Sequence, residues 1–382
     1  MKILMIAPEP FFEPRGTPFS EYYRIKALSS LGHEIDLITY PIGEDVEIKG
    51  LKIIRCLRPF FIKKVKTGPS GAKVFLDFFL FFKVFGRILT KRYDYIHTHE
   101  EANIMGACFS TIFRTPHLYD MHSSLVQQMN NFKFTKSKLI VWFFKTIEKI
   151  SLKNAKSIIV ICPSLFKYAS TITEASKLTT IENFMDETPE KLNKERLETL
   201  KKSLNIKDKK VIVYAGTLET YQGIPMLIES MKYLDESFLL VLIGGDPPQV
   251  EKLKSSLNSD KDNIILLGRK SPEEIPYYLS IADILVSPRI LGTNIPLKVY
   301  SYLKSGIPLV ATNLYTHTQT LTKDISVLVE PDSKAFAEGI KIATSKEGMD
   351  IAKNAKEYCN KNYNEQKYID LVNIAINKTI EE

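Results

Sequence analysis

Short apolar runs alternate with helical patterns along the first half of the chain. Runs rich in Ile, Val and Leu predict buried strands, and apolar residues at every third or fourth position predict helices. The predicted strands are residues 3–7, 35–39, 53–55, 95–98, 117–120, 157–161 and 178–181. The predicted helices are residues 20–31, 73–90 and 137–152. Continuous apolar runs of this kind are typical of parallel strands that helices cover on both faces.

A second alternating series follows the polar stretch "DETPEKLNKERLETLKKSLNIKDKK", which is typical of a linker and a solvated helix. The predicted strands are residues 211–215, 239–243, 264–267, 284–286, 308–312 and 326–328. The predicted helices are residues 223–233, 247–257, 272–279, 296–304 and 333–344, with a last amphipathic helix from 349 to about 377. We therefore predict two doubly wound α/β domains, 1–184 and 185–355. A C-terminal segment, 356–382, is predicted to pack back as a helix on the first domain.

Composition indicates an ordinary globular protein. Of the 382 residues, 44% are hydrophobic and 25% are charged, and no apolar stretch reaches the roughly 20 residues that span a bilayer. The start, "MKILMIAPEP", is too short for a signal peptide and predicts a first strand. The four cysteines are scattered without a C-x-x-C pair. They predict reduced thiols in a cytoplasmic protein.

The net charge of +8 is unevenly distributed. Between Lys49 and Arg92 there are twelve basic residues and one acidic residue, Asp77. Within this segment five phenylalanines fall on one helical stripe: Phe75, Phe78, Phe79, Phe82 and Phe85. The ordinary interpretation is a helix whose stripe faces the domain core. The alternative is a basic, aromatic surface that meets an anionic membrane. A nucleic-acid partner is not predicted, because these aromatic residues lie inside an apolar run instead of along a polar strand.

Glycines follow several predicted strands, where backbone N–H groups can approach a phosphate or a sugar. Gly16, next to Arg15, lies in the first strand-to-helix loop. In the second half Gly216 and Gly244 end strands, and Glu219 and Gln222 lie in the loop after Gly216. Neither the G-x-G-x-x-G fingerprint nor the P-loop motif is present in the sequence.

Histidines also gather at predicted strand ends. His97 and His99 alternate along one strand and so share a face, and His122 follows the next strand. A structural role is the ordinary interpretation of such a residue. The polar residues after His122 favour a contact with a ligand. The spacing does not match a metal-binding motif, so no metal site is predicted.

Two cations surround the start of the predicted helix 296–304. Pro296 suits the first helical position, and Thr293 and Asn294 are candidate caps. Lys298 lies in the first turn and Arg289 a few residues upstream, although a helix N-terminus favours anions. The sequence therefore predicts an anion that the chain does not itself supply.

The motifs "DYIHTH", "YAGTLETYQGIPMLIES", "ADILVSPR" and "PLKVYSYLKSGIPLVAT" occur in this order. In this order they resemble the family 4 glycosyltransferases of the GT-B fold, over nearly the whole chain. The resemblance implies two Rossmann-like domains facing across a cleft, with a nucleotide-sugar donor mainly on the second domain. It also implies transfer with retention of anomeric configuration to a glycan or lipid-linked acceptor, without a metal or other cofactor. The enzyme would then be cytoplasmic, with the inner face of the membrane as a candidate site of peripheral attachment.

The chain departs from the family pattern at four positions. Thr293 and Ser301 stand where the family usually has two glutamates, and Thr217 and Gln222 stand where it commonly has an arginine and a lysine. We expect Arg289 and Lys298 to bind the donor diphosphate instead. Two alternatives remain open, a catalytically silent sugar-nucleotide-binding protein and a nucleotide-sugar epimerase.

The site residues that follow from the motifs and the resemblance fall into three groups. His122 is expected to contact the transferred sugar, and Arg15 and His99 are placed on the acceptor side. The donor residues are Gly16, Gly216, Thr217, Glu219, Gln222, Gly244, Arg289, Thr293, Asn294, Pro296, Leu297, Lys298 and Ser301.

Overall fold

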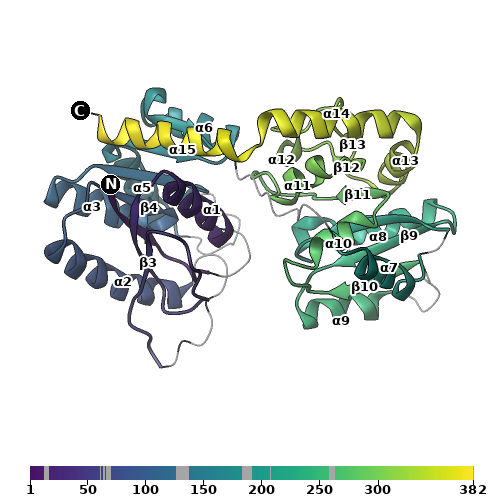
Figure 1. The fold of residues 1–382 in the computed structure, drawn as a ribbon, viewed down its shortest axis with the longest axis horizontal. Helices are drawn as coiled ribbons and strands as arrows, with labels where there is room; N and C mark the ends of the chain where they lie inside the picture. Colours follow the sequence, from purple (N-terminus) through teal and green to yellow (C-terminus); the bar gives the residue numbers. More distant parts are fainter. Residues whose placement is uncertain are drawn as a thin grey trace. The chain divides into compact units, whose positions relative to one another are not determined.

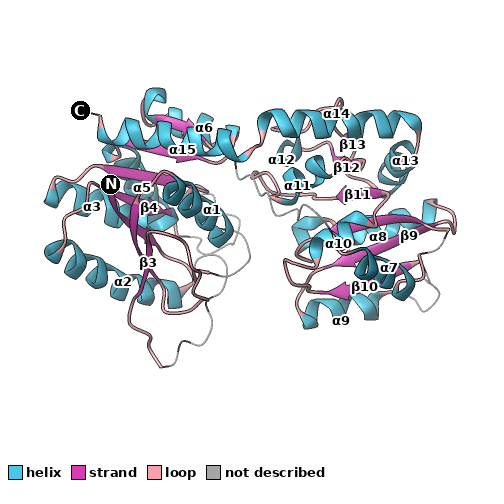
Figure 2. Ribbon diagram, in the orientation of Figure 1, coloured by secondary structure: helices cyan, strands magenta, loops and turns pink. Residues whose placement is uncertain are grey.

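The computed structural model describes residues 1–12, 17–60, 62, 65, 70–125, 137–182, 192–206, 208–257 and 263–381. The chain divides into two compact units. Unit 1 comprises Met1–Asn183 and Glu365–Glu382, and unit 2 comprises Phe184–Asn364. Each unit is a parallel sheet with helices packed against it (Figures 1 and 2). The fold class predicted from the alternating pattern is confirmed.

Unit 1 contains a seven-stranded sheet in the order β3-β2-β1-β4-β5-β6-β7. Its strands are β1 (Lys2–Ala7), β2 (Glu34–Thr39), β3 (Leu51–Arg55), β4 (Tyr95–His99), β5 (His117–Met121), β6 (Ser157–Val160) and β7 (Leu178–Thr180). Its α-helices are α1 (Thr17–Ser30), α2 (Gly71–Thr90), α3 (Asn103–Phe113), α5 (Lys138–Asn154), α6 (Pro163–Ser170) and α15 (Glu365–Ile380). Two short 3-10 helices are η1 (Glu100–Ala102) and η2 (Ala175–Lys177).

The sheet of unit 1 is buried along its central strands. β1 pairs in parallel with β2 and β4, and every residue of β4 and β5 is buried. This burial explains why the central strands read as continuous apolar runs in the sequence. It also means that the polar residues on β4 and β5 must find partners inside the unit.

The orientation of α2 corrects the ordinary interpretation of the phenylalanine stripe. The helix buries Leu76, Leu80, Val84 and Ile88 against the sheet. Phe75, Phe78, Phe82 and Phe85 lie on the opposite side and are exposed, and Phe79 is half-buried. The i, i+4 row of aliphatic residues fits the sheet and the rings face outward. In an almost wholly apolar helix, periodicity alone does not distinguish these two faces.

Unit 2 contains a six-stranded sheet in the order β10-β9-β8-β11-β12-β13. Its strands are β8 (Lys210–Ala215), β9 (Phe238–Ile243), β10 (Ile264–Gly268), β11 (Ile284–Ser287), β12 (Leu309–Thr312) and β13 (Val327–Val329). Its α-helices are α7 (Lys194–Ser203), α8 (Ile224–Ser230), α9 (Pro247–Ser256), α10 (Ile275–Ser280), α11 (Lys298–Ser305), α12 (Tyr315–Thr318), α13 (Ser333–Ala343) and α14 (Lys346–Asn362). The 3-10 helices are η3 (Thr220–Gln222) and η4 (Met231–Tyr233).

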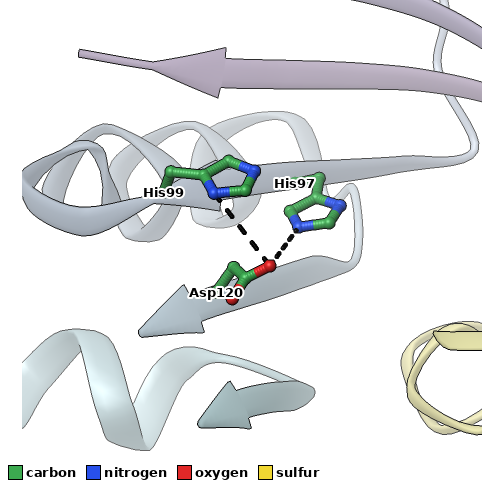
Figure 3. A group of neighbouring side chains, drawn as sticks. All are labelled: His97, His99 and Asp120. Carbon is green, nitrogen blue, oxygen red and sulfur yellow. Dashed lines mark ion pairs between the residues drawn. The ribbon is translucent and has the colours of Figure 1, made fainter. Parts of the chain in front are cut away.

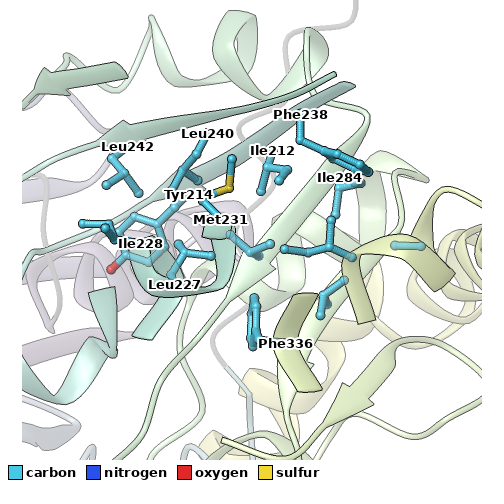
Figure 4. Packing of buried hydrophobic residues seen from close by; sticks show 14 of the residues in the cluster. Ile212, Tyr214, Leu227, Ile228, Met231, Phe238, Leu240, Leu242, Ile284 and Phe336 are labelled. Carbon is cyan, nitrogen blue, oxygen red and sulfur yellow. The ribbon is translucent and has the colours of Figure 1, made fainter. Parts of the chain in front are cut away.

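The core of unit 2 lies between the sheet and helices α8 and α13. Ile212, Leu240 and Ile284 from three strands pack with Leu227 of α8 and Phe336 of α13 (Figure 4). The ring of Tyr214 on β8 belongs to the same cluster. This packing fixes the strands of unit 2, and the loops of the unit begin at their ends.

The C-terminal region forms two helices where the sequence pattern predicted one. α14 ends at Asn362, and Tyr363 leaves the helical conformation with φ −125° and ψ 81°. The ring of Tyr363 packs edge-on against those of Tyr300 and Tyr358. α14 packs on α11 in unit 2, whereas α15 packs on α1 and on strands β5 to β7 in unit 1. An amphipathic pattern continues through such a break, so the pattern alone did not reveal it.

Two further observations bear on the compositional expectations. All four cysteines are free. Across the described residues, no helix combines the length and the apolarity needed to cross a membrane.

Candidate functional site

Several residues of the predicted donor site lie in loops at the carboxyl edge of the sheet of unit 2. The loops after β8, β9, β11 and β12 carry Gly216, Gly244, Arg289 and Asn313. Parallel strands bring their carboxyl ends to one edge of a sheet, and doubly wound folds bind ligands there.

Lys298, the first residue of α11, is a charged group at this edge whose ammonium has no hydrogen-bond partner among the described residues. Its Nζ is buried and lies 3.6 Å from the centroid of the Tyr214 ring. Burial, and then the positive charge of Arg289, hold the pKa of Lys298 well below its usual value. A buried ammonium without a carboxylate partner is costly, so this arrangement calls for an external anion.

Arg289 places a second positive charge near Lys298. Its guanidinium lies over the Tyr221 ring, 5.0 Å from the centroid. Nε donates to the carbonyl of Leu291 at 2.9 Å, and Nη1 donates to the carbonyl of Asn294 at 3.0 Å. Burial lowers the pKa of Arg289 from its usual value, although an arginine stays protonated at neutral pH. Two aromatic faces and backbone carbonyls thus hold both cations, and no carboxylate forms a salt bridge with either side chain in the described structure.

Gly216 and Gly244 let two loops approach each other closely beside Lys298. A Cβ on Gly244, whose φ is +123°, would lie 1.8 Å from the carbonyl oxygen of Gly216. A Cβ on Gly216 would lie 3.1 Å from Lys298 Nζ and 2.9 Å from Tyr214 Oη. A side chain at Gly216 would therefore fill the space beside the unpaired ammonium, and one at Gly244 would clash with the backbone of Gly216.

Thr217, Glu219 and Gln222 follow Gly216 in the same loop. Gln222 is buried, and its Nε2 donates to Thr217 Oγ1 at 3.4 Å. Its Oε1 is a second buried polar atom without a hydrogen-bond partner among the described residues. Glu219 instead accepts from Gln249 Nε2 at 2.9 Å, at the start of α9. Thr217 and Gln222 therefore stay at the edge as neutral groups, and Glu219 is engaged with a neighbouring loop.

The start of α11 differs from the sequence prediction. The helix begins at Lys298 after Leu297, which offers no side-chain cap, so Pro296 is not its first residue. Thr293 and Asn294 do not cap it, because Leu297 is the cap residue and both lie in the loop before it. Ser301 donates to the carbonyl of Lys298 at 3.0 Å.

The segment Tyr315–Gln319 braces this loop. Thr316 Oγ1 donates to the carbonyl of Asn294 at 2.7 Å, and Gln319 Nε2 donates to that of Thr293 at 2.6 Å. His317 is buried, with Nε2 2.8 Å from Ser287 Oγ and Nδ1 3.0 Å from the carbonyl of Thr312. Burial lowers the pKa of His317 to about 3, which leaves the ring neutral at physiological pH.

Unit 1 holds a different polar cluster at the ends of β4 and β5. Arg24 on α1 donates from Nε to Asp120 Oδ2 at 2.7 Å, and both side chains are fully buried. His122 Nε2 lies 3.2 Å from Asp120 Oδ1, and His97 Nε2 lies 3.5 Å from Oδ2. Burial would raise the pKa of Asp120, but Arg24 and His122 outweigh it and hold the pKa well below its usual value. Asp120 is therefore the ionised centre of the cluster.

The donor atoms of His97, His99 and Asp120 all lie within 4.8 Å of one another, which is close enough for a metal ion (Figure 3). Burial lowers the pKa of both histidines, so both rings are neutral, as metal ligands must be. However, Arg24 donates to the same Oδ2 and its positive charge would repel a divalent cation. The chemistry of the set fits a self-neutralised cluster better than a metal centre.

Of the residues predicted for the site in unit 1, the structure describes His99 and His122. His99 and His122 are buried, with ring centroids 5.6 Å apart. Glu9 and Glu21 are buried nearby, and burial raises the pKa of Glu9 to about 7. Arg15 and Gly16 lie outside the described residues.

Sequence reasoning missed four residues of these two clusters. Arg24 lies on the buried side of α1 and Asp120 on β5, and Tyr214 and Tyr221 lie at the end of β8 and in the loop after it. The alternation of Asp120 with His122 along "HLYDMH" was the one available signal, since alternate residues share a face of a strand.

The sequence matches two family models over consecutive regions. Residues 22–188 match "Glycosyltransferase Family 4", and residues 196–363 match "Glycosyl transferases group 1". Two Bacillus subtilis (strain 168) proteins with provisional names as glycosyltransferases are also similar. YtcC is 28% identical over 178 residues, and TuaC, named for teichuronic acid biosynthesis, is 29% identical over 150 residues. The matches span 42% and 39% of this chain and only 43% and 36% of those relatives.

Solved structures share the fold over almost the whole chain. HepE of Anabaena in complex with UDP has a TM-score of 0.77 at 16% identity, and the match covers 98% of this chain and 99% of HepE. A glycosyltransferase of Rickettsia africae has a TM-score of 0.74 at 15% identity, with 100% and 99% covered. The chain thus has the fold of the GT-B glycosyltransferases, and the family models support a glycosyltransferase.

Proposed function

We propose that the chain is a glycosyltransferase whose donor, a nucleoside-diphosphate sugar, binds at the carboxyl edge of unit 2. The observation that carries this proposal is the buried, unpaired ammonium of Lys298 beside Arg289. HepE, which shares the fold, has been solved with UDP and with UDP-glucose. Lys298 and Arg289 bind the diphosphate, and Gly216 and Gly244 leave space for it.

The same two cations assist the reaction. As the bond between the sugar and the diphosphate breaks, negative charge builds on the leaving oxygen. Lys298 and Arg289, already fixed by aromatic rings and backbone carbonyls, stabilise that charge without reorganisation. A charge-assisted hydrogen bond of this kind contributes about 1.5–3 kcal/mol.

The remaining parts of the proposal rest on the family 4 resemblance. The sugar is transferred with retention, without a metal ion, to a glycan or lipid-linked acceptor on the side of unit 1. The enzyme is cytoplasmic and acts at the inner face of the membrane. If this is right, chelation with EDTA leaves the transfer rate unchanged, whereas a fall that Mg²⁺ restores would contradict metal-independent transfer.

Calorimetric titration with UDP tests the donor site. Lys298→Ala should weaken UDP binding about tenfold or more, because it removes a charge-assisted contact. Lys304→Ala, which removes a lysine from the last turn of the same helix, is the matched control and should bind UDP like the wild type. Equal affinities in all three proteins would overturn the assignment.

His122 is proposed as the residue of unit 1 that contacts the transferred sugar. His122→Ala should lower the transfer rate by about a hundredfold, as the loss of one transition-state hydrogen bond does, and leave UDP affinity unchanged. His33→Ala, on the loop before β2, is the control. Comparable losses of transfer and of UDP binding would indicate a structural histidine.

A second candidate is a protein that binds the nucleotide sugar without transferring it. Ser301, where the family has a ribose-binding glutamate, donates to its own helix, so the usual carboxylate is missing here. Slow hydrolysis of a donor that the protein binds would favour an active enzyme. Tight UDP binding with neither hydrolysis nor transfer, over a panel of acceptors, would favour the silent protein.

A further inference from the structure

Helices α2, α3 and α5 of unit 1 expose an unusual concentration of apolar side chains. Of the 23 large apolar residues that are exposed in the described chain, twelve lie on these helices: six on α2, one on α3 and five on α5. Ring contacts such as Phe81 with Phe109 join α2 to α3, and α3 packs against α5. The outward sides of the three helices therefore form one surface, which we call the α2/α3/α5 face.

The exposed side chains of this face follow the helical period. On α2 they are Val74, Phe75, Phe78, Phe82, Phe85 and Leu89, opposite the aliphatic row that packs on the sheet. On α5 they are Leu139, Ile140, Trp142, Phe143 and Ile150. Trp142 is 62% exposed and Phe78 is 57% exposed. Such large rings in contact with water are costly unless something covers them.

The charges of the face have one sign. The acidic residues of the three helices are Asp77 and Glu148, and both are turned inward. Asp77 accepts from Tyr40 Oη at 2.6 Å, and Glu148 accepts from Ser124 Oγ at 3.0 Å. Exposed basic residues on the helices and just beyond their ends are Lys83, Arg92, Arg114, Lys145, Lys149 and Lys153. Lys149 and Lys153 share the outward side of α5 with Trp142, at spacings of seven and eleven residues.

We propose that the α2/α3/α5 face binds the surface of an anionic lipid bilayer. Phenylalanine, leucine and tryptophan side chains enter the headgroup layer, and the lysines and arginines contact lipid phosphates. A second copy of the chain is a poor partner, because the two positive faces would repel each other. A nucleic acid would leave the aliphatic and aromatic surface uncovered. This inference places the proposed acceptor reaction at the membrane, but the binding itself does not depend on sugar transfer.

The single tryptophan of the chain makes the test direct, because it lies on this face. With vesicles of phosphatidylcholine and phosphatidylglycerol at low salt, the full-length protein should co-sediment and its tryptophan emission should shift to shorter wavelengths. Vesicles of phosphatidylcholine alone should bind at least about tenfold more weakly, and salt should reduce the difference.

Two sets of charge reversals distinguish this face from general basicity. Changing Lys145, Lys149 and Lys153 together to Glu should weaken vesicle binding about tenfold or more. The control changes Lys194, Lys202 and Lys252, exposed lysines of unit 2, to Glu and should retain binding. Phe78→Ser with Phe82→Ser should also weaken binding at unchanged charge.

Three outcomes would overturn the proposal. They are a protein that stays in the supernatant with anionic vesicles at low salt, equal binding in both triple variants, and concentration-dependent dimers that the Phe78→Ser and Phe82→Ser changes abolish. UDP titration of the same variants separates this proposal from the donor site. A variant that loses vesicle binding but keeps its UDP affinity supports the α2/α3/α5 face as the membrane site. A variant that keeps vesicle binding but loses UDP affinity bears on the donor site at Lys298.

Discussion

The two units bury charge in opposite ways. In unit 1, Asp120 is fully buried but forms an ion pair with Arg24, which neutralises it. In unit 2, Lys298 is buried with Arg289 as its charged neighbour, so the local charge is doubly positive. The charge of the first cluster is balanced within the chain, whereas the second lacks an anion. The comparison suggests that an unbalanced buried charge marks a binding site more specifically than a dense cluster of polar residues.

The largest expected effect is on the balanced cluster. Asp120→Asn leaves Arg24 buried without its partner and should lower the free energy of unfolding of unit 1 by about 3–5 kcal/mol. Asp45→Asn breaks the exposed pair with Arg55 and should change it by less than about 1 kcal/mol. Denaturant unfolding measures both. A small effect of Asp120→Asn would mean that the pair contributes no more than a surface ion pair.

Removing the charge of Lys298 should have the opposite effect on stability to removing that of Asp120. Lys298→Met should leave unit 2 as stable as the wild type or more stable, because no partner loses its charge. The pKa of Lys298 is lowered in the folded protein, so between that pKa and the usual 10.5 the unfolded chain binds more protons. Wild-type stability should therefore rise with pH across this window relative to the variant. A variant that is less stable at every pH would indicate a hidden partner for the ammonium.

The brace formed by Thr316 should have an intermediate effect. Thr316→Val removes a hydrogen bond to the carbonyl of Asn294, which also accepts from Arg289. We expect UDP affinity to fall about fivefold, as a loss of about 1 kcal/mol gives, while Thr318→Val serves as the control. If both variants bind UDP equally, the brace does not position Arg289.

The smallest effect is expected at Ser301. Its hydroxyl donates to the carbonyl of Lys298. Ser301→Ala should change UDP affinity by less than about twofold, as measured by calorimetry, since the structure gives the hydroxyl an intrahelical partner already. A large loss would show that the hydroxyl turns towards the nucleotide when it binds.

Much of the fold followed from the sequence because parallel strands covered on both faces leave a strong pattern. The break between α14 and α15 could not be predicted from the sequence, since the packing of Tyr363 on Tyr300 interrupts a continuous amphipathic pattern. The outward face of α2 was equally hidden, because both of its sides are apolar.

Part of the candidate site was predictable because two cations lie near a helix N-terminus, where anions are normally favoured. Lys298 and Arg289 near a helix N-terminus pointed to an anion, and the structure brings both to the carboxyl edge of one sheet. Thr293 and Asn294 were wrongly assigned as caps, because Leu297 takes the N-cap position and Thr316 and Gln319 fix the preceding loop by donating to its carbonyls. Those partners are more than twenty residues distant in the sequence, so local capping rules could not include them.

The central claim is that the buried ammonium of Lys298 binds the diphosphate of a nucleotide. UDP affinity measured from about pH 7 to about pH 8.5 tests it directly, because the phosphates of UDP are almost fully ionised there, with a second phosphate pKa of about 6, and the uracil ring is still neutral. Wild-type affinity should fall with rising pH as Lys298 loses its proton, and Lys298→Met should bind more weakly with little dependence on pH. Equal affinities with parallel pH profiles in the two proteins would contradict the account.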